Sequence, residues 1–179
     1  MQFNALHPET RLLLNSWKTI NGLGDSLVNN NLASRDVGSM IDRLFMIQRV
    51  AEGVFVYKTL GKEITSWVGR DLKDNEISTI FFGPDKVLIR ALLESAIHAP
   101  GPALARIIAF GAKIGQRTEI EMVFLPLMEK SGVARMLGLF QPVAANVTIS
   151  RPAIRFSIAE LIPPDPRTPR NPGLRLVKK

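Results

Sequence analysis

The sequence contains no cysteine, which excludes disulfide bonds, thiolate metal sites, cysteine nucleophiles, iron–sulfur clusters and flavin sensors that form a cysteinyl adduct. Histidine is nearly absent as well, because the chain has only His7 and His98. A three-histidine metal site or a relay of several histidines is therefore excluded within one chain. Much of the chemistry of enzymes is removed by these two absences, and we expect no cofactor and no metal site.

Long apolar runs are missing too. The most apolar stretches, residues 122–128 and 133–140, are interrupted by proline or charge and fall far short of the about 20 residues that a membrane-spanning helix needs. Residues 1–11 lack the basic region and the apolar run of a signal peptide. These observations predict a cytoplasmic protein without a membrane span.

The positive charge of the chain is unevenly distributed. Residues 163–179 carry five basic residues and one acidic residue, a charge of +4, which leaves +3 of the total +7 for residues 1–162. This tail also holds five prolines, which predicts an extended or disordered segment. It has no aromatic residues to stack on bases, so a docking or solubilising role is favoured, and binding to nucleic acid or another acidic surface is the alternative.

Apolar residues at helical spacing predict an amphipathic helix over residues 8–20, followed by a loop rich in glycine and asparagine. The apolar stripe of this helix consists of Leu12, Leu13, Trp17 and Ile20. Because a single stripe cannot form a core, we expect the helix to cover a sheet surface.

Strand-like and helical runs alternate along the rest of the chain. Residues 44–50 and 54–60 flank a short turn and predict a hairpin. After one or two apolar helical turns near residue 64, a longer helix starts at Pro84 and stops before residues 99–102. Three more strand-like runs favour an antiparallel meander over residues 104–113, 119–128 and 134–143. Residues 147–158 are compatible with a further short strand or with an arm.

Several short motifs follow one another along these elements. They are a short helix that runs into the first strand over residues 36–48, Lys58-Thr59-Leu60-Gly61, Val68-Gly69-Arg70-Asp71-Leu72, Leu125-Pro126-Leu127 and Leu137-Gly138-Leu139-Phe140-Gln141-Pro142. Residues 35–143 therefore resemble a family of compact single-domain bacterial PAS proteins found mainly in alphaproteobacteria. The sequence departs from the family pattern at Trp67, where phenylalanine is more usual, and at residues 73–75, where the family often carries a glycine.

The resemblance implies an α+β fold, with a five-stranded antiparallel sheet, short helices on one face and the N-terminal helix as an addition. We expect a helix and linker over residues 1–34, the PAS-like domain over residues 35–145, and an arm with a basic tail over residues 146–179. The implied function is a non-enzymatic sensory or regulatory role, exerted through a homodimer and a separate signalling protein. The resemblance also implies that the N-terminal helix contributes its apolar stripe, Leu12, Leu13, Trp17 and Ile20, to the homodimer interface.

PAS domains bind small molecules between sheet and helices, and the sequence offers candidates for such a cavity. The side chains that would line it are Phe55, Tyr57, Leu92, Ile108, Phe110, Met122, Phe124 and Phe140. Ordinary core packing is the alternative explanation for all of them.

Two other features have a structural and a functional interpretation. His98 stands at the end of the predicted helix, where capping of terminal carbonyls or contact with solvent is favoured over haem ligation. Glu119 and Glu121 share one strand face, and salt bridges to Lys113 or Arg135 are favoured over paired acid–base chemistry.

Overall fold

The structure is a computed structural model that describes residues 6–22, 38–127, 134–143 and 151–165. Much of the predicted linker, and the predicted tail from residue 166 onward, lie outside the described residues. Six strands form one sheet in the order β2-β1-β5-β4-β3-β6, and every neighbouring pair is antiparallel. The strands are β1 Leu44–Ala51, β2 Val54–Leu60, β3 Ala103–Phe110, β4 Arg117–Leu127, β5 Arg135–Pro142 and β6 Arg155–Ile162. The helices are α1 Pro8–Gly22, α3 Lys62–Val68 and α4 Asp85–His98, and the 3-10 turns are η3 Ile41–Arg43 and η4 Ile77–Ile80.

The prediction of five strands is wrong by one strand. Residues 155–162 form β6 on the edge of β3, whereas the sequence left residues 147–158 open as a short strand or an arm and placed residues 146–179 in the arm and tail. Beyond it Pro164 is buried beside Gly101, so the first residues of the predicted tail also pack on the domain. Local periodicity does not reveal such an addition, because β6 is stabilised by a partner strand about fifty residues earlier in the chain.

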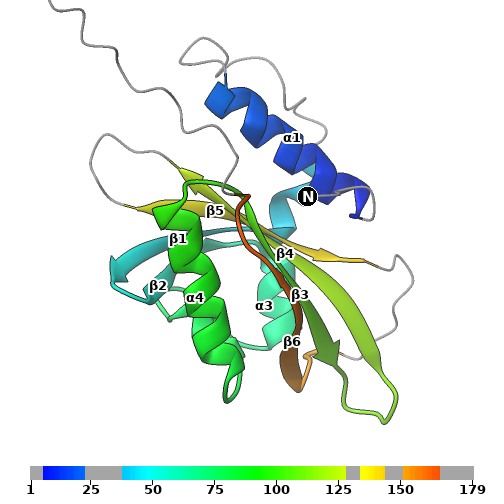
Figure 1. The fold of residues 1–179 in the computed structure, drawn as a ribbon. Helices are drawn as coiled ribbons and strands as arrows, with labels where there is room; N and C mark the ends of the chain where they lie inside the picture. The colour runs from blue at the N-terminus through cyan, green and yellow to red at the C-terminus, as the bar shows by residue number, and fades with distance from the viewer. Residues whose placement is uncertain (1–5, 23–37, 128–133, 144–150, 166–179) are drawn as a thin grey trace, which may run out of the picture.

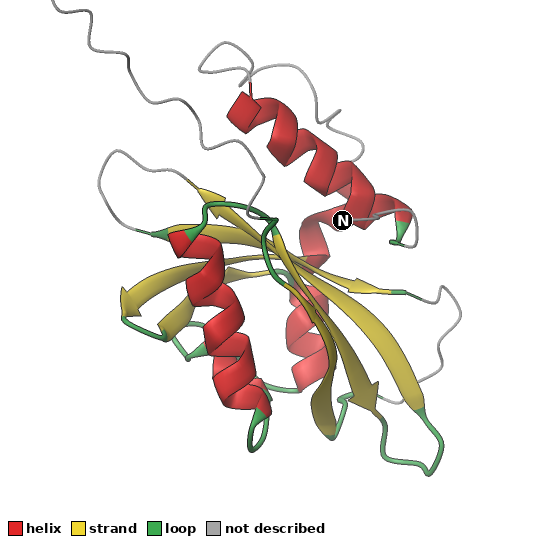
Figure 2. Ribbon diagram, viewed as in Figure 1, coloured by secondary structure: helices red, strands yellow, loops and turns green. Residues whose placement is uncertain are grey.

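The sheet is covered on both faces, as Figures 1 and 2 show. We call the face that packs against α3, η4 and α4 the inner face, and the face that packs against α1 the outer face. Alternation along β4 separates them, because Ile120, Met122 and Phe124 belong to the inner core and Val123 and Leu125 to the outer one. The near-continuous apolar run of β4 is therefore explained by burial on both sides.

On the outer face, α1 lies across the sheet. Leu13, Leu14 and Trp17 are buried against a patch formed by Leu104, Val123, Leu125 and Leu139. The indole nitrogen of Trp17 donates a hydrogen bond of 2.9 Å to the carbonyl oxygen of Pro126. Leu12 is half-buried against the same cluster, and the side chain of Ile20 lies outside the described residues. Most of the apolar stripe of α1 is thus buried within one chain.

None of the helices among the described residues combines the length and the apolar character that a membrane crossing requires.

Candidate functional site

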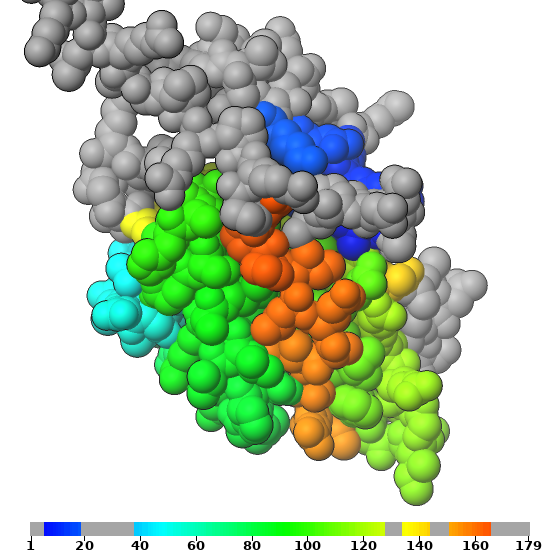
Figure 3. Space-filling view, in the orientation of Figure 1, coloured from blue at the N-terminus to red at the C-terminus, as the bar shows by residue number. Residues whose placement is uncertain are grey.

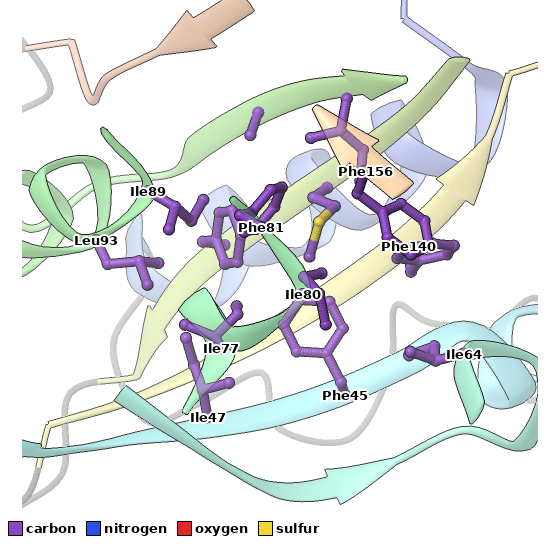
Figure 4. Close-up of a cluster of buried hydrophobic side chains, with 14 of the residues drawn as sticks. Phe45, Ile47, Ile64, Ile77, Ile80, Phe81, Ile89, Leu93, Phe140 and Phe156 are labelled. Atoms are coloured by element: carbon purple, nitrogen blue, oxygen red, sulfur yellow. The ribbon is translucent and has the colours of Figure 1, made fainter. Parts of the chain in front are cut away.

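The space between the inner face and the helices, which we call the chamber, contains six of the eight predicted cavity residues. They are Phe55, Tyr57, Leu92, Met122, Phe124 and Phe140, and all are buried in one cluster. Figure 4 shows part of this cluster, with Phe45 and Phe140 from the sheet facing Ile77, Ile80 and Phe81 from the helical side. Buried side chains occupy this space, so packing accounts for most of the apolar residues in it.

Ile108 and Phe110 are not in the chamber. They alternate with Ile107 and Ala109, which belong to the inner core, and so lie on the outer face and only partly buried. The sequence could not settle the orientation of β3, because its two faces are both apolar. The inner positions of this strand hold small residues, mainly alanine, because α4 and large neighbouring side chains occupy the space.

Two polar groups in the chamber have no hydrogen-bond partner among the described residues. They are the hydroxyl of Tyr57 on β2 and the indole nitrogen of Trp67 on α3. Burial raises the pKa of the Tyr57 hydroxyl above its ordinary value, so the group stays protonated and can donate a hydrogen bond. An unpaired buried donor destabilises the folded state, and two in one core are a feature that packing does not explain.

Aromatic rings form two groups in the chamber, in which the contacts are edge-on except for the tilted pair of Trp67 and Phe140. Phe45 contacts Tyr57 and Phe124, with ring centroids 5.7 and 5.8 Å apart. Phe140 stands between Trp67 and Phe156, at 6.1 and 6.2 Å. The second group joins three separate segments, α3, β5 and β6, so that its geometry depends on all three.

Ion pairs at the rim hold the helices against the sheet. Arg49 on β1 donates to Glu94 on α4 at 2.7 Å, and the same carboxylate accepts the backbone N–H of Gly53 in the β1–β2 turn. Arg90 on α4 makes two hydrogen bonds, of 2.6 and 2.9 Å, to Glu76 at the start of η4. These contacts fix the position of α4 over the chamber.

Acidification is expected to weaken the contact between η4 and α4. Hydrogen bonds from Arg90 hold the pKa of Glu76 below its ordinary value of 4.5. The ion pair therefore contributes fully to stability above the ordinary pKa of 4.5. Its contribution is lost as the pH falls through the lower pKa of the folded state. Because both side chains are partly exposed, we expect Glu76→Gln to lower the free energy of unfolding by about 0.5 to 1 kcal/mol at neutral pH.

Urea unfolding of the wild type and of Glu76→Gln, at pH 7 and pH 3, measures this contribution. The difference between the two proteins should shrink at the lower pH. An equal difference at both values would show that the charge of Glu76 has no part in it.

The two glutamates on β4 are bridged by an arginine that the sequence did not identify. Arg106 on the neighbouring strand β3 lies 3.6 Å from Glu119, 4.0 Å from Glu121 and 3.0 Å from Glu160 on β6. The buried carboxylate of Glu121 also accepts the backbone N–H of His7 at 3.1 Å, which ties the start of α1 to the sheet. Strand register places Arg106 opposite Glu121. The salt-bridge partner of the two glutamates is therefore Arg106, and the prediction of Lys113 or Arg135 is wrong.

His98 lies in the last turn of α4 and is largely exposed. Its Nδ1 is 2.8 Å from the carbonyl oxygen of Glu94 and 3.6 Å from the carboxylate of the same residue. This position corresponds to the capping interpretation. Among the residues that the structure describes, no three histidine or carboxylate side chains are grouped so that they could hold a metal ion.

Comparison with models of protein families gives a match over most of the chain. A family model described as a PAS domain matches residues 5–141, which are 137 of the 179 residues. The match includes α1, the chamber helices and strands β1 to β4, and it ends within β5, before β6. No curated protein matches the chain.

Proposed function

This chain belongs to the PAS domain family, a family of sensory and regulatory modules, and from that membership we propose that it is a non-enzymatic regulator that acts by binding other proteins. The observation that carries the proposal is the family match over residues 5–141. The apolar and aromatic character of the chamber supports the non-enzymatic part, because such a lining suits binding better than proton transfer.

We further propose that the chamber binds a small, uncharged and largely apolar molecule with a hydrogen-bond acceptor. Tyr57 and Trp67 support this choice, since each offers a donor without a partner among the described residues. An acceptor on a ligand would satisfy a donor whose burial is otherwise unfavourable. A charged ligand fits poorly, because the surrounding cluster is apolar.

Tyr57→Phe is the variant that separates a ligand site from a plain core. Without ligand, removal of the unpaired hydroxyl should leave the free energy of unfolding unchanged or raise it by about 1 kcal/mol. If the hydroxyl binds a ligand, the variant should also lose most of the small molecule that copurifies with the wild type. Native mass spectrometry of both proteins, with solvent extraction, measures the bound fraction.

Leu125→Ile is the control, because it changes a buried residue of the outer core, away from the chamber, without altering a polar group. Absorption spectra of the same samples should show no band beyond the aromatic region. A near-stoichiometric haem or flavin band would contradict the proposed ligand class, and unliganded protein from the native source would contradict ligand binding.

We propose a homodimer and a separate signalling protein as partners, because PAS domains commonly mediate dimerisation or signalling interactions. Light scattering gives the oligomeric state, and capture from the source cell gives the partner. Recovery of nucleic acid instead of protein, lost on removal of residues 166–179, would favour the alternative that the basic tail binds nucleic acid.

A further inference from the structure

Residues 151–162, which include β6, lie outside the family match and yet complete the chamber. We call them the strap. Phe156 and Ala153 are buried in the inner core, and Ile158 and Leu161 pack against it. Figure 4 shows Phe156 beside Phe140, and in Figure 3 β6 lies next to α4 on the visible face. The strap thus closes the side of the chamber between α4 and β3.

The first residues of the strap are attached to α3. The backbone N–H of Ala153 donates a hydrogen bond of 2.8 Å to the carbonyl oxygen of Trp67. The guanidinium of Arg151 lies 4.5 Å from the centre of the Trp67 ring and 3.0 Å from Glu63. At the end of α3, Gly69 has a φ of +76°, and a Cβ there would come within 2.6 Å of Pro152. The strap therefore covers the same tryptophan whose indole nitrogen has no described partner.

The rest of the strap is held by backbone pairing and by a few polar contacts. β6 pairs with β3 along one edge, with an irregularity between Arg106 and Ile107. Asp85 at the start of α4 accepts hydrogen bonds of 3.0 Å from the Ser157 hydroxyl and the Ile158 N–H. Arg106 pairs with Glu160, which is half exposed. The pair of Arg106 and Glu160 is exposed and competes with water, whereas the contacts of Asp85 are partly buried.

Burial distinguishes β6 from the strand that it pairs with. One of its eight residues is buried, against five of eight in β3. An edge strand with little buried surface opens at a lower free energy than the centre of the sheet. Opening would remove Phe156 from Phe140 and expose the Trp67 side of the chamber, where the unpaired indole N–H could then find a partner.

We propose that the strap is a displaceable cover of the chamber, and that its opening admits small molecules to the site at Trp67. The proposal rests on the proposed function for its biological purpose, because a cover regulates a ligand site only if a ligand binds there. Passage of a small neutral probe tests the cover itself, whether or not a natural ligand exists.

A reversible cross-link across β3 and β6 tests the proposal. Phe110 and Arg155 are cross-strand partners on the outer face and belong to neither core cluster. Directly opposed strand residues are close enough for a disulfide after small adjustments, and the chain has no other cysteine to compete. Phe110→Cys with Arg155→Cys therefore locks the strap when oxidised and releases it when reduced.

Acrylamide quenching of Trp67 fluorescence, with Trp17→Phe in every protein, reports access to the chamber. We expect the quenching rate constant to be at least about fivefold lower in the oxidised than in the reduced form, because the strap must open for the quencher to pass. The matched control is Gln48→Cys with Val56→Cys, which cross-links β1 to β2 at the opposite edge and should leave quenching unchanged. Equal quenching in the oxidised and reduced strap variants would overturn the proposal.

Hydrogen exchange on the chain without added cysteines gives a second measurement. Backbone amides of β6 should exchange at least about tenfold faster than those of β4, through local opening. Exchange of β6 at the rate of β4 would overturn the proposal even if the disulfide fails to form. If copurification shows no ligand but oxidation still protects Trp67, the proposed ligand is refuted and the cover stands.

Discussion

Gly138→Ala is expected to lower the free energy of unfolding by about 2 to 3 kcal/mol, as overpacking of a filled core does. Gly138 on β5 stands directly between Phe45 on β1 and Phe124 on β4 in the strand register. The two rings meet over it with centroids 5.8 Å apart, and a Cβ at position 138 would overlap the ring of Phe45. The backbone around position 138 must then shift, or the side chain of Phe45 must leave its favoured rotamer.

Gly38→Ala is the matched control, because a Cβ at that position has nothing within 4 Å. Phe45→Leu in the Gly138→Ala background removes most of the overlapping ring, so the double variant should be more stable than the sum of the single changes predicts. Urea unfolding of the wild type, Gly138→Ala, Phe45→Leu and the double variant measures the coupling between the two positions. Additive effects would show that Phe45 is not the group that excludes a side chain at position 138.

Leu13→Asp with Trp17→Asp is expected to lower the free energy of unfolding by about 3 to 6 kcal/mol, the stabilisation lost when two large side chains are no longer buried. Both residues lie under α1 against the outer face, and neither is more than 8% exposed. The double variant also loses the hydrogen bond from Trp17 to Pro126. Carboxylates cannot stay charged in that apolar contact, so α1 should detach and expose the patch that it covers.

Arg11→Asp is the matched control, since it changes the net charge by the same amount at an exposed position of the same helix. Thermal unfolding and light scattering are measured on the wild type, the double variant and Arg11→Asp. They distinguish the packing of α1 on its own sheet from its proposed part in a homodimer. Loss of stability with an unchanged oligomeric state would assign the helix to its own sheet and refute its proposed part in a homodimer. A double variant as stable as the wild type would contradict the packing of α1 itself.

Several parts of the fold could be predicted because their signals are local. The strand prediction for residues 54–60 is confirmed, with β2 at Val54–Leu60, because a turn and a run of β-branched and aromatic residues define it. The helix that begins near Pro84 was recognisable from its apolar face and its proline-rich stop, and α4 ends at His98. In β2 the aromatic residues Phe55 and Tyr57 stand at alternate positions, and in the first half of β4 apolar residues alternate with Glu119 and Glu121, so the inner face of these strands followed from the sequence.

Other parts depend on contacts between distant segments. β3 is apolar on both faces, and packing under α4 decides that its alanines point inward and Ile108 and Phe110 outward. The partner of Glu121 is Arg106 because strand register places them side by side.

The sequence by itself thus determined the absence of cysteine chemistry, the main helices and strands, and six of the residues that line the chamber. Tertiary structure alone decided the sixth strand, the cover over Trp67 and the two unpaired donors of the chamber. The physical reason is that periodicity reports which side of an element is apolar, whereas a free strand edge and an unpaired hydrogen-bond donor are defined by neighbours that are remote in the chain.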